Sequence, residues 1–372
     1  MHIYRTFASA LVALVIAAPL QADPAATLRE ALASVPMLPD ATEGPGFADL
    51  TVAADVLAVR DLTGVAEYFL GPLGPISLAL PLGGAPQPTT NSERAWPQLV
   101  GFAPDDIRTV VNYGTPPRAA VRLALEPGVT SRVEVALVAN GYDRVESDDG
   151  LLFRRGGADY EISLLDRNPD DPFGGMLGQA SRVLVQGDIL TRSAGMPAIK
   201  AGATGPFWGD RPDLAALLDT LSALPEGTRV MRAQVLADPL AFAPREFMPD
   251  AGEGPAVPGI PYWSLGMLLE LVEGETHDAA ALAAFVYATR DQAEEARQGV
   301  ESGWTVPAPY WLDTPAERIG PAVPSIEGEG PFVLLVHVAG EWTTEGFMTN
   351  LPFRRLYEGY ARRALAVFGP PP

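Results

Sequence analysis

The density of glycine and proline limits the fold of this chain more than any other feature. There are 37 of each among 372 residues, about one residue in five. Proline removes a backbone hydrogen-bond donor and glycine weakens regular structure, so helices and strands are expected to be short. Because 47% of the residues are nonetheless hydrophobic, the chain has enough apolar material for a core. The composition therefore predicts a globular protein built from many short elements.

Charge and cysteine content exclude several classes of function. The chain has 46 acidic and 26 basic residues, a formal charge of −20, and Lys200 is its only lysine. Such a field repels phosphates, so no nucleic-acid partner is expected. The sequence contains no cysteine, which excludes disulfides, thiolate metal sites and cysteine nucleophiles.

The first 22 residues have the layout of a secretory signal peptide. Arg5 gives a short positive start, residues 7–18 are apolar, and the small residue Ala22 stands before the predicted cleavage point. The apolar run is shorter than the roughly 20 residues that a membrane-spanning helix needs. We therefore expect cleavage after Ala22 and a soluble, periplasmic or secreted protein without a stable membrane anchor.

Apolar periodicity and turn residues predict the secondary structure. The predicted helices cover residues 24–35, 51–60, 104–114, 131–140, 212–224, 291–300 and 353–368. The predicted strands cover residues 119–125, 142–146, 151–154, 182–186, 189–192, 229–236, 265–272, 281–288 and 332–339, with a further strand or loop at 76–80. Residues 39–47 are expected to form a Gly/Pro turn.

These elements predict an α+β fold with mostly antiparallel or mixed strands covered by helices, because hairpins alternate with single helices. A stretch rich in Pro, Asp and Gly divides the elements into two sheet-containing halves. We expect an N-terminal α+β half at 23–165, a connector at 166–180 and a C-terminal α+β half at 181–372.

No catalytic residues are predicted, because the histidines are poorly placed for catalysis. Only His277 and His337 remain after export. His337 lies in an apolar run typical of a buried strand, where a structural histidine bonded to a backbone carbonyl is favoured over a general base. Ser264 has Tyr262 where a nucleophile elbow needs glycine. Paired carboxylates stay open as an alternative, since the chain is rich in acids.

One acidic stretch resembles the start of a calcium loop. Asp166, Asn168 and Asp170 place oxygen atoms at alternating positions, as a hard cation requires. The stretch has Asp171 where the turn glycine is needed and Leu177 where a bidentate glutamate is needed. An ordinary Asp/Asn/Pro turn is therefore favoured, and neither a metal nor a cofactor is predicted.

Aromatic residues in proline-stiffened loops, or in aromatic pairs beside Pro or Gly, are the candidate ligand-binding residues. They are Trp263, Trp304, Tyr310 and Trp311. Flat rings of this kind stack on sugars or hold an extended peptide, and they also plug loops against a core.

The sequence thus favours a non-enzymatic, exported protein that binds a ligand or partner in the cell envelope, either an envelope protein or a glycan. The alternative is a carboxylate-based hydrolase acting on envelope polysaccharide.

Overall fold

A computed structural model describes residues 23–39, 43–59, 90–168, 170–238, 259–304, 319–343, 349–361 and 366–368. The predicted signal peptide at 1–22 and the strand or loop predicted at 76–80 lie outside the described residues. Tyr310 and Trp311 lie outside them as well.

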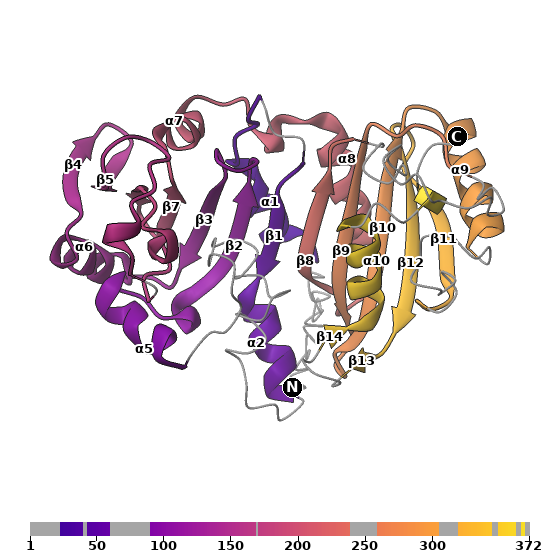
Figure 1. Cartoon of the computed structure of the whole chain (residues 1–372). Helices are drawn as coiled ribbons and strands as arrows, with labels where there is room; N and C mark the ends of the chain where they lie inside the picture. The colour runs from indigo at the N-terminus through magenta and orange to yellow at the C-terminus, as the bar shows by residue number, and fades with distance from the viewer. Residues whose placement is uncertain are drawn as a thin grey trace, which may run out of the picture.

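Twelve of the described strands form one twisted sheet in which every neighbouring pair is antiparallel (Figure 1). A separate two-stranded ribbon joins β13 (Trp342–Thr343) to β14 (Thr349–Asn350). Across the large sheet the order is β11 (Ala322–Glu327), β12 (Phe332–Gly340), β10 (Asp278–Tyr287), β9 (Leu265–Glu273), β8 (Arg229–Leu236), β1 (Gly46–Asp49), β2 (Ile107–Tyr113), β3 (Ala120–Leu125), β7 (Ile189–Ser193), β6 (Ser181–Gln186), β5 (Gly150–Arg155) and β4 (Asp143–Ser147).

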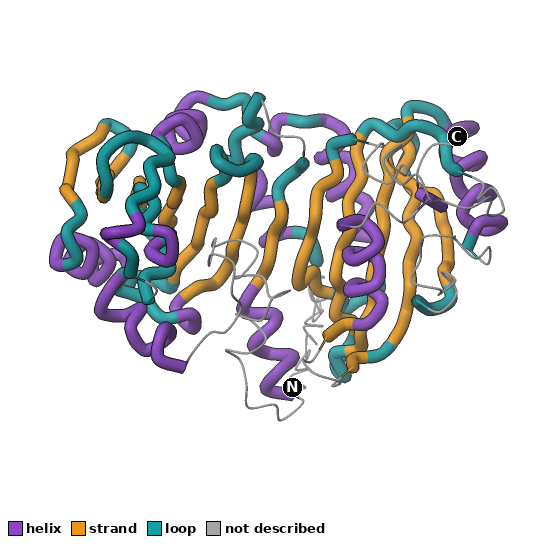
Figure 2. Tube along the Cα trace, in the orientation of Figure 1, coloured by secondary structure: helices purple, strands orange, loops and turns teal. Residues whose placement is uncertain are grey.

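Helices cover both faces of the sheet, which Figure 2 shows as purple coils on either side of the orange strands. The front face in Figure 1 carries α2 (Leu50–Val59), α5 (Thr90–Leu99), α6 (Thr130–Ala139), α9 (Arg290–Gly303) and α10 (Leu351–Ala361). The back face carries α1 (Ala26–Ala33), α7 (Met196–Thr204) and α8 (Pro212–Thr220).

Strand β10 shows how the sheet separates the two layers. Ala283 and Phe285 pack toward the front-face helices, whereas Leu282 and Ala284 pack toward the back-face helices. This alternation follows from the period of two along a strand. Because both faces are covered, β9 and β10 are buried along nearly their whole length, and their sequences are apolar except for Glu270 in β9 and the terminal residues Glu273 and Asp278.

The predicted α+β fold with helices covering antiparallel strands is confirmed. The helices expected at 24–35, 51–60, 131–140, 212–224 and 291–300 are present, and so are the two hairpins and the four predicted strands that follow them.

Three local predictions are wrong or incomplete. Residues 104–114 do not form a helix: Pro104–Asp106 make one 3-10 turn, and Ile107–Tyr113 form β2. The residues Ile107, Val110 and Val111 are β-branched and favour a strand once a neighbouring strand is present. The turn expected at 39–47 gives way to β1 at its end. The helix expected at 353–368 is α10 (Leu351–Ala361), and Ala366–Phe368 form a 3-10 turn.

The expected connector at 166–180 joins β5 to β6, and these two strands pair with each other. Residues on both sides of the connector therefore contribute strands to the same sheet. A division of the chain into two units at this segment stays a prediction.

Candidate functional site

A cleft of about 340 Å³ opens on the back face of the sheet between α1 and strands β2 and β3. We call it the arginine cleft, because two arginines line it from adjacent strands. Its volume falls within the range of roughly 300–1,000 Å³ that small-molecule sites usually have. Its lining consists of Thr27, Glu30, Ala31, Ser34, Asp49, Thr51, Arg108, Thr109, Val111, Arg122, Ala124 and Ile189.

Strand pairing brings the two arginines together. Arg122 of β3 lies opposite Val111 of β2, which places it on the cleft side of the sheet. The register of β2 shifts between Ile107 and Thr109, and Arg108, within this irregularity, also lines the cleft. Such an irregularity re-aims a side chain that regular alternation would send to the opposite face.

Each guanidinium is held by a backbone carbonyl. Arg122 Nη1 donates to the carbonyl of Ser34 at 3.1 Å, at the end of α1. Arg108 Nε donates to the carbonyl of Leu125 at 3.1 Å. Within the described ranges neither guanidinium forms an ion pair with a carboxylate. Since a guanidinium has five N–H donors, each arginine keeps donors for a ligand.

Partial burial sets the electrostatics of the cleft. Burial lowers the pKa of Arg122, and the nearby Tyr113 phenol opposes that change. The guanidinium stays protonated at neutral pH, as arginine does in proteins. Burial also raises the pKa of Tyr113 to about 12, so its phenol stays neutral beside the cation. The positive charge near the cleft is therefore not cancelled by Tyr113.

Two carboxylates line the same cleft, but they differ in availability. Asp49 is buried, and its Oδ1 accepts hydrogen bonds from Thr51 N at 3.0 Å, Thr51 Oγ1 at 2.6 Å and Val52 N at 3.2 Å. It therefore acts as the N-terminal cap of α2. Glu30 is exposed on α1 at the rim. The arrangement can bind a carboxylate or phosphate group through the arginines, because a guanidinium matches the geometry of both.

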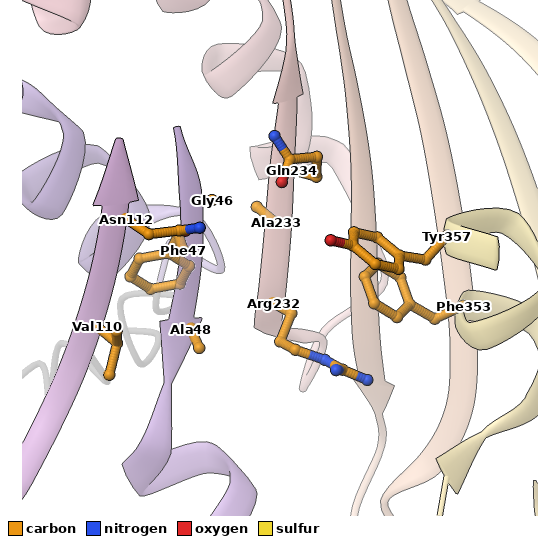
Figure 3. Close-up of a pocket in the computed structure, with 10 residues that line it drawn as sticks. All are labelled: Gly46, Phe47, Ala48, Val110, Asn112, Arg232, Ala233, Gln234, Phe353 and Tyr357. Carbon is orange, nitrogen blue, oxygen red and sulfur yellow. The ribbon is translucent and has the colours of Figure 1, made fainter. Parts of the chain in front are cut away.

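A second pocket lies on the front face and is too small for a small-molecule ligand (Figure 3). It has a volume of about 40 Å³, enough for a few water molecules. Phe353 and Tyr357 of α10 face Arg232 and Gln234 across it. The Arg232 guanidinium lies 4.7 Å from the centre of the Phe353 ring and forms an ion pair with the buried Glu270. The contact with Phe353 packs α10 against the sheet, and the ion pair joins β8 to β9.

The aromatic residues predicted from the sequence lie elsewhere. Trp263 and Trp304 are 3% and 5% exposed and pack in the front-face core. Their indole nitrogens donate to the carbonyls of Phe368 at 3.4 Å and Gly320 at 3.0 Å. This burial favours the interpretation that these rings plug loops against the core, since a stacked sugar needs an open ring face.

The calcium-like stretch forms a turn. Asp166 and Asp170 are exposed, and the amide oxygen of Asn168 accepts a hydrogen bond from Asp170 N at 3.2 Å. In the described part of the chain no three or more His, Cys, Asp or Glu side chains are grouped so that they could hold a metal ion.

Both histidines make structural contacts. His337 Nε2 lies 2.8 Å from Glu273 Oε1, so its partner is a carboxylate of the neighbouring sheet region where we expected a backbone carbonyl. His277 has a positive φ of 53° and lies in the turn between β9 and β10. Its Nε2 is 2.9 Å from Arg229 Nη2, and its carbonyl accepts from the Trp342 indole at 2.8 Å.

Comparison with known proteins does not assign the chain to a family. No protein-family model matches the sequence, and no curated protein matches it. Among solved structures, crystal form I of TP0453 of T. pallidum has a TM-score of 0.37 and 7% identity, covering 89% of this chain and 96% of that one. Among the residues that the structure describes, no helix has the length and apolar character needed to cross a bilayer.

Sequence reasoning missed Arg108 and Arg122. The available signal was an arginine inside the strand at 119–125, flanked by alanine, valine and leucine. It could not be combined with Arg108 because residues 104–114 were expected to be helical. Recognising β2 as a strand next to β3 is what brings the two arginines together.

Proposed function

We propose that this chain is an exported, non-enzymatic protein of the cell envelope that binds a small ligand carrying a carboxylate or phosphate group in the arginine cleft. The export step rests on the layout of residues 1–22. The observation that carries the ligand proposal is the pair Arg108 and Arg122, which line one cleft without a carboxylate partner among the described residues.

The surplus of acids makes this observation informative. The chain has 46 acidic residues for 26 basic ones, so an arginine with a purely structural role has many potential partners. Arg29, Arg132, Arg155, Arg182 and Arg211 each pair with an aspartate. Arg108 and Arg122 bond instead to carbonyls, which leaves their charge for a ligand.

The hydroxyl groups in the cleft fit the same ligand. Thr27, Ser34 and Thr109 line it, and hydroxyls donate to the same oxygen atoms as a guanidinium does. Charge-assisted hydrogen bonds contribute about 1.5–3 kcal/mol each, so two of them supply about 3–6 kcal/mol. Micromolar affinity requires about 8 kcal/mol, and the enclosed remainder of the ligand has to supply the difference.

A carboxylate-based hydrolase is the second candidate, because Glu30 and Asp49 line the same cleft. The three hydrogen bonds that Asp49 Oδ1 accepts within the N-terminal turn of α2 favour a capping role for this carboxylate over a catalytic one. Incubating the mature protein with envelope polysaccharide and following the release of reducing ends tests this candidate. Release that is abolished by Glu30→Gln would replace binding with hydrolysis as the function.

Titration calorimetry on residues 23–372 tests the binding proposal, with succinate and inorganic phosphate as separate probes. Replacing one arginine, in Arg108→Gln or Arg122→Gln, is expected to weaken binding of the preferred probe about tenfold or more, from the loss of about 1.5–3 kcal/mol. Glu30→Gln is expected to strengthen binding of the probe, because the variant removes a negative charge that repels the anion from the rim. Arg144→Gln is the control, since Arg144 pairs with Glu134 on the surface.

The pattern of the variants decides the outcome. Absence of binding for both probes contradicts the proposal. Equal affinities for Arg122→Gln and Arg144→Gln would place the anion outside the cleft. Weaker binding of the anionic probe by Glu30→Gln would contradict the expected repulsion between the probe and the rim carboxylate.

A further inference from the structure

Four large aliphatic side chains are exposed together around the connector at 166–180. Ile162, Leu164, Leu165 and Leu177 are 53%, 63%, 98% and 43% exposed. The short 3-10 turns that carry three of them, Leu164–Asp166 and Gly175–Leu177, pack against each other. We call these four residues the apolar tip. Single exposed aliphatic residues are common on protein surfaces, but several exposed within one short segment are typical of an interaction site.

Backbone hydrogen bonds fix the shape of the segment that presents the tip. Ser163 N donates to Gly178 O at 3.0 Å, and Ala180 N donates to Glu161 O at 2.8 Å. Inside this ladder, Asn168 N donates to Gly175 O at 2.9 Å. The tip is thus held in place by main-chain bonds although its side chains face solvent. A preordered surface loses less entropy on binding than a flexible loop does.

Buried residues anchor the same segment to the sheet. Phe173 is fully buried in the front-face core. Asp171, whose side chain is 3% exposed, forms an ion pair with Arg155 and accepts a hydrogen bond from Phe173 N at 2.8 Å. The buried Arg192 donates to the carbonyl of Phe173 at 3.0 Å. The segment that carries the apolar tip is therefore anchored to the sheet, and the exposure of the tip follows from the fold.

Charges around the tip indicate what can cover it. Glu161, Asp166 and Asp170 are exposed acids, and Arg167 is the exposed base among them. A second copy of this chain would bring the same acids face to face and carries the same formal charge of −20. An anionic lipid surface would be repelled for the same reason. A protein surface with an apolar groove and basic residues around its rim complements both features.

We propose that the apolar tip docks into the apolar groove of a second protein of the cell envelope, and that basic residues on that protein's rim face Asp166 and Asp170. This contact is separate from the arginine cleft, and none of the residues that line the cleft belongs to the tip.

Site-specific photo-crosslinking of the full chain in its native host tests the proposal. A benzophenone amino acid at Leu165 is expected to give one discrete adduct with a different protein, whose crosslinked peptide carries Lys or Arg next to apolar residues. The matched control places the same amino acid at Val323, which is 62% exposed on the edge strand β11 at the opposite end of the sheet order, and it is expected to give no such adduct.

Charge reversal makes the test specific for the proposed partner. Asp166→Arg together with Asp170→Arg, with the crosslinker kept at Leu165, is expected to lower the adduct yield about fivefold, because rim charges set the rate of encounter. An unchanged melting temperature for this variant shows that the support is intact. An adduct with a second copy or with lipid, a yield that ignores charge reversal, or no adduct at all would overturn the proposal.

Discussion

Replacing Asp171 tests whether a buried charge pair holds the connector in place. The Asp171 side chain is 3% exposed and has two functions: one oxygen pairs with Arg155, and Oδ1 accepts from Phe173 N at 2.8 Å. Asp171→Asn removes the charge but keeps an acceptor for Phe173 N. Asp171→Ala removes both. The two variants therefore separate the ion pair from the backbone hydrogen bond.

The structure gives the expected magnitudes. Removing one partner of a buried pair costs about 3–5 kcal/mol, and because Arg155 keeps 23% exposure we take the lower end, about 3 kcal/mol, for Asp171→Asn. Asp171→Ala also leaves a buried N–H group without an acceptor, which adds about 1–3 kcal/mol. The neighbouring Arg192 is a second cation close to Asp171. Burial lowers its pKa to about 10, so it stays protonated at pH 7 and loses a nearby negative charge in both variants.

Urea unfolding of residues 23–372 at pH 7, followed by circular dichroism, measures both changes. The exposed Asp170 supplies the control Asp170→Asn, which we expect within about 0.5 kcal/mol of the wild type. If Asp171→Asn also stays within that limit, the ion pair does not anchor the connector. If the Asn and Ala variants lose the same stability, the hydrogen bond to Phe173 N has no measurable role.

Three further variants test other parts of the account. Burial raises the pKa of the Glu270 carboxyl above its usual value of 4.5, so the folded state holds this proton more tightly than the unfolded state does. The resulting stability is present at low pH and is lost as the pH rises through the folded-state pKa. Glu270→Gln should therefore gain stability relative to the wild type with rising pH, by at most about 1.4 kcal/mol per pH unit in urea unfolding, and parallel pH curves would refute this. Gly178 has a φ of +58°, and a Cβ there would collide with the carbonyl oxygen of Ser163. Gly178→Ala should therefore expose residues 160–180 to limited proteolysis, and an unchanged cleavage pattern would contradict this. Asn350 is fully buried, donates to the carbonyls of Leu271 at 3.3 Å and Ala280 at 2.8 Å, and accepts from Phe353 N at 3.1 Å. Asn350→Ala should cost about 2–4 kcal/mol in the same unfolding assay, and a loss below about 1 kcal/mol would show that this cap does not hold α10.

The sequence predicts most of the individual elements because their local signals are strong. The apolar runs at 265–272 and 332–339 predict strands, the second of them buried on both faces, and β9 and β12 lie there. The order of strands in the sheet could not be predicted, since it depends on pairings between distant residues. Gly46–Asp49 illustrates this: it is four residues long, follows a Gly/Pro stretch, and is a strand because β2 and β8 pair with its two edges.

The candidate site was harder to predict than the fold. Trp263 and Trp304 have the residue type of a ligand-binding surface, but exposure depends on tertiary packing, and both are buried. Arg108 was unpredictable for a different reason. Pro104, Asp105 and Asp106 form a good helix start, and only the pairing with β3 shows that the chain continues as a strand into the arginine cleft.

The most direct test of the central claim is native mass spectrometry of the protein isolated from its host. The wild-type protein and the Arg144→Gln control are expected to retain a small molecule that carries a carboxylate or phosphate group, and Arg122→Gln is expected to lose it. Retention of the same molecule by Arg122→Gln, or the absence of any small molecule from the wild-type protein, would contradict anion binding in the arginine cleft.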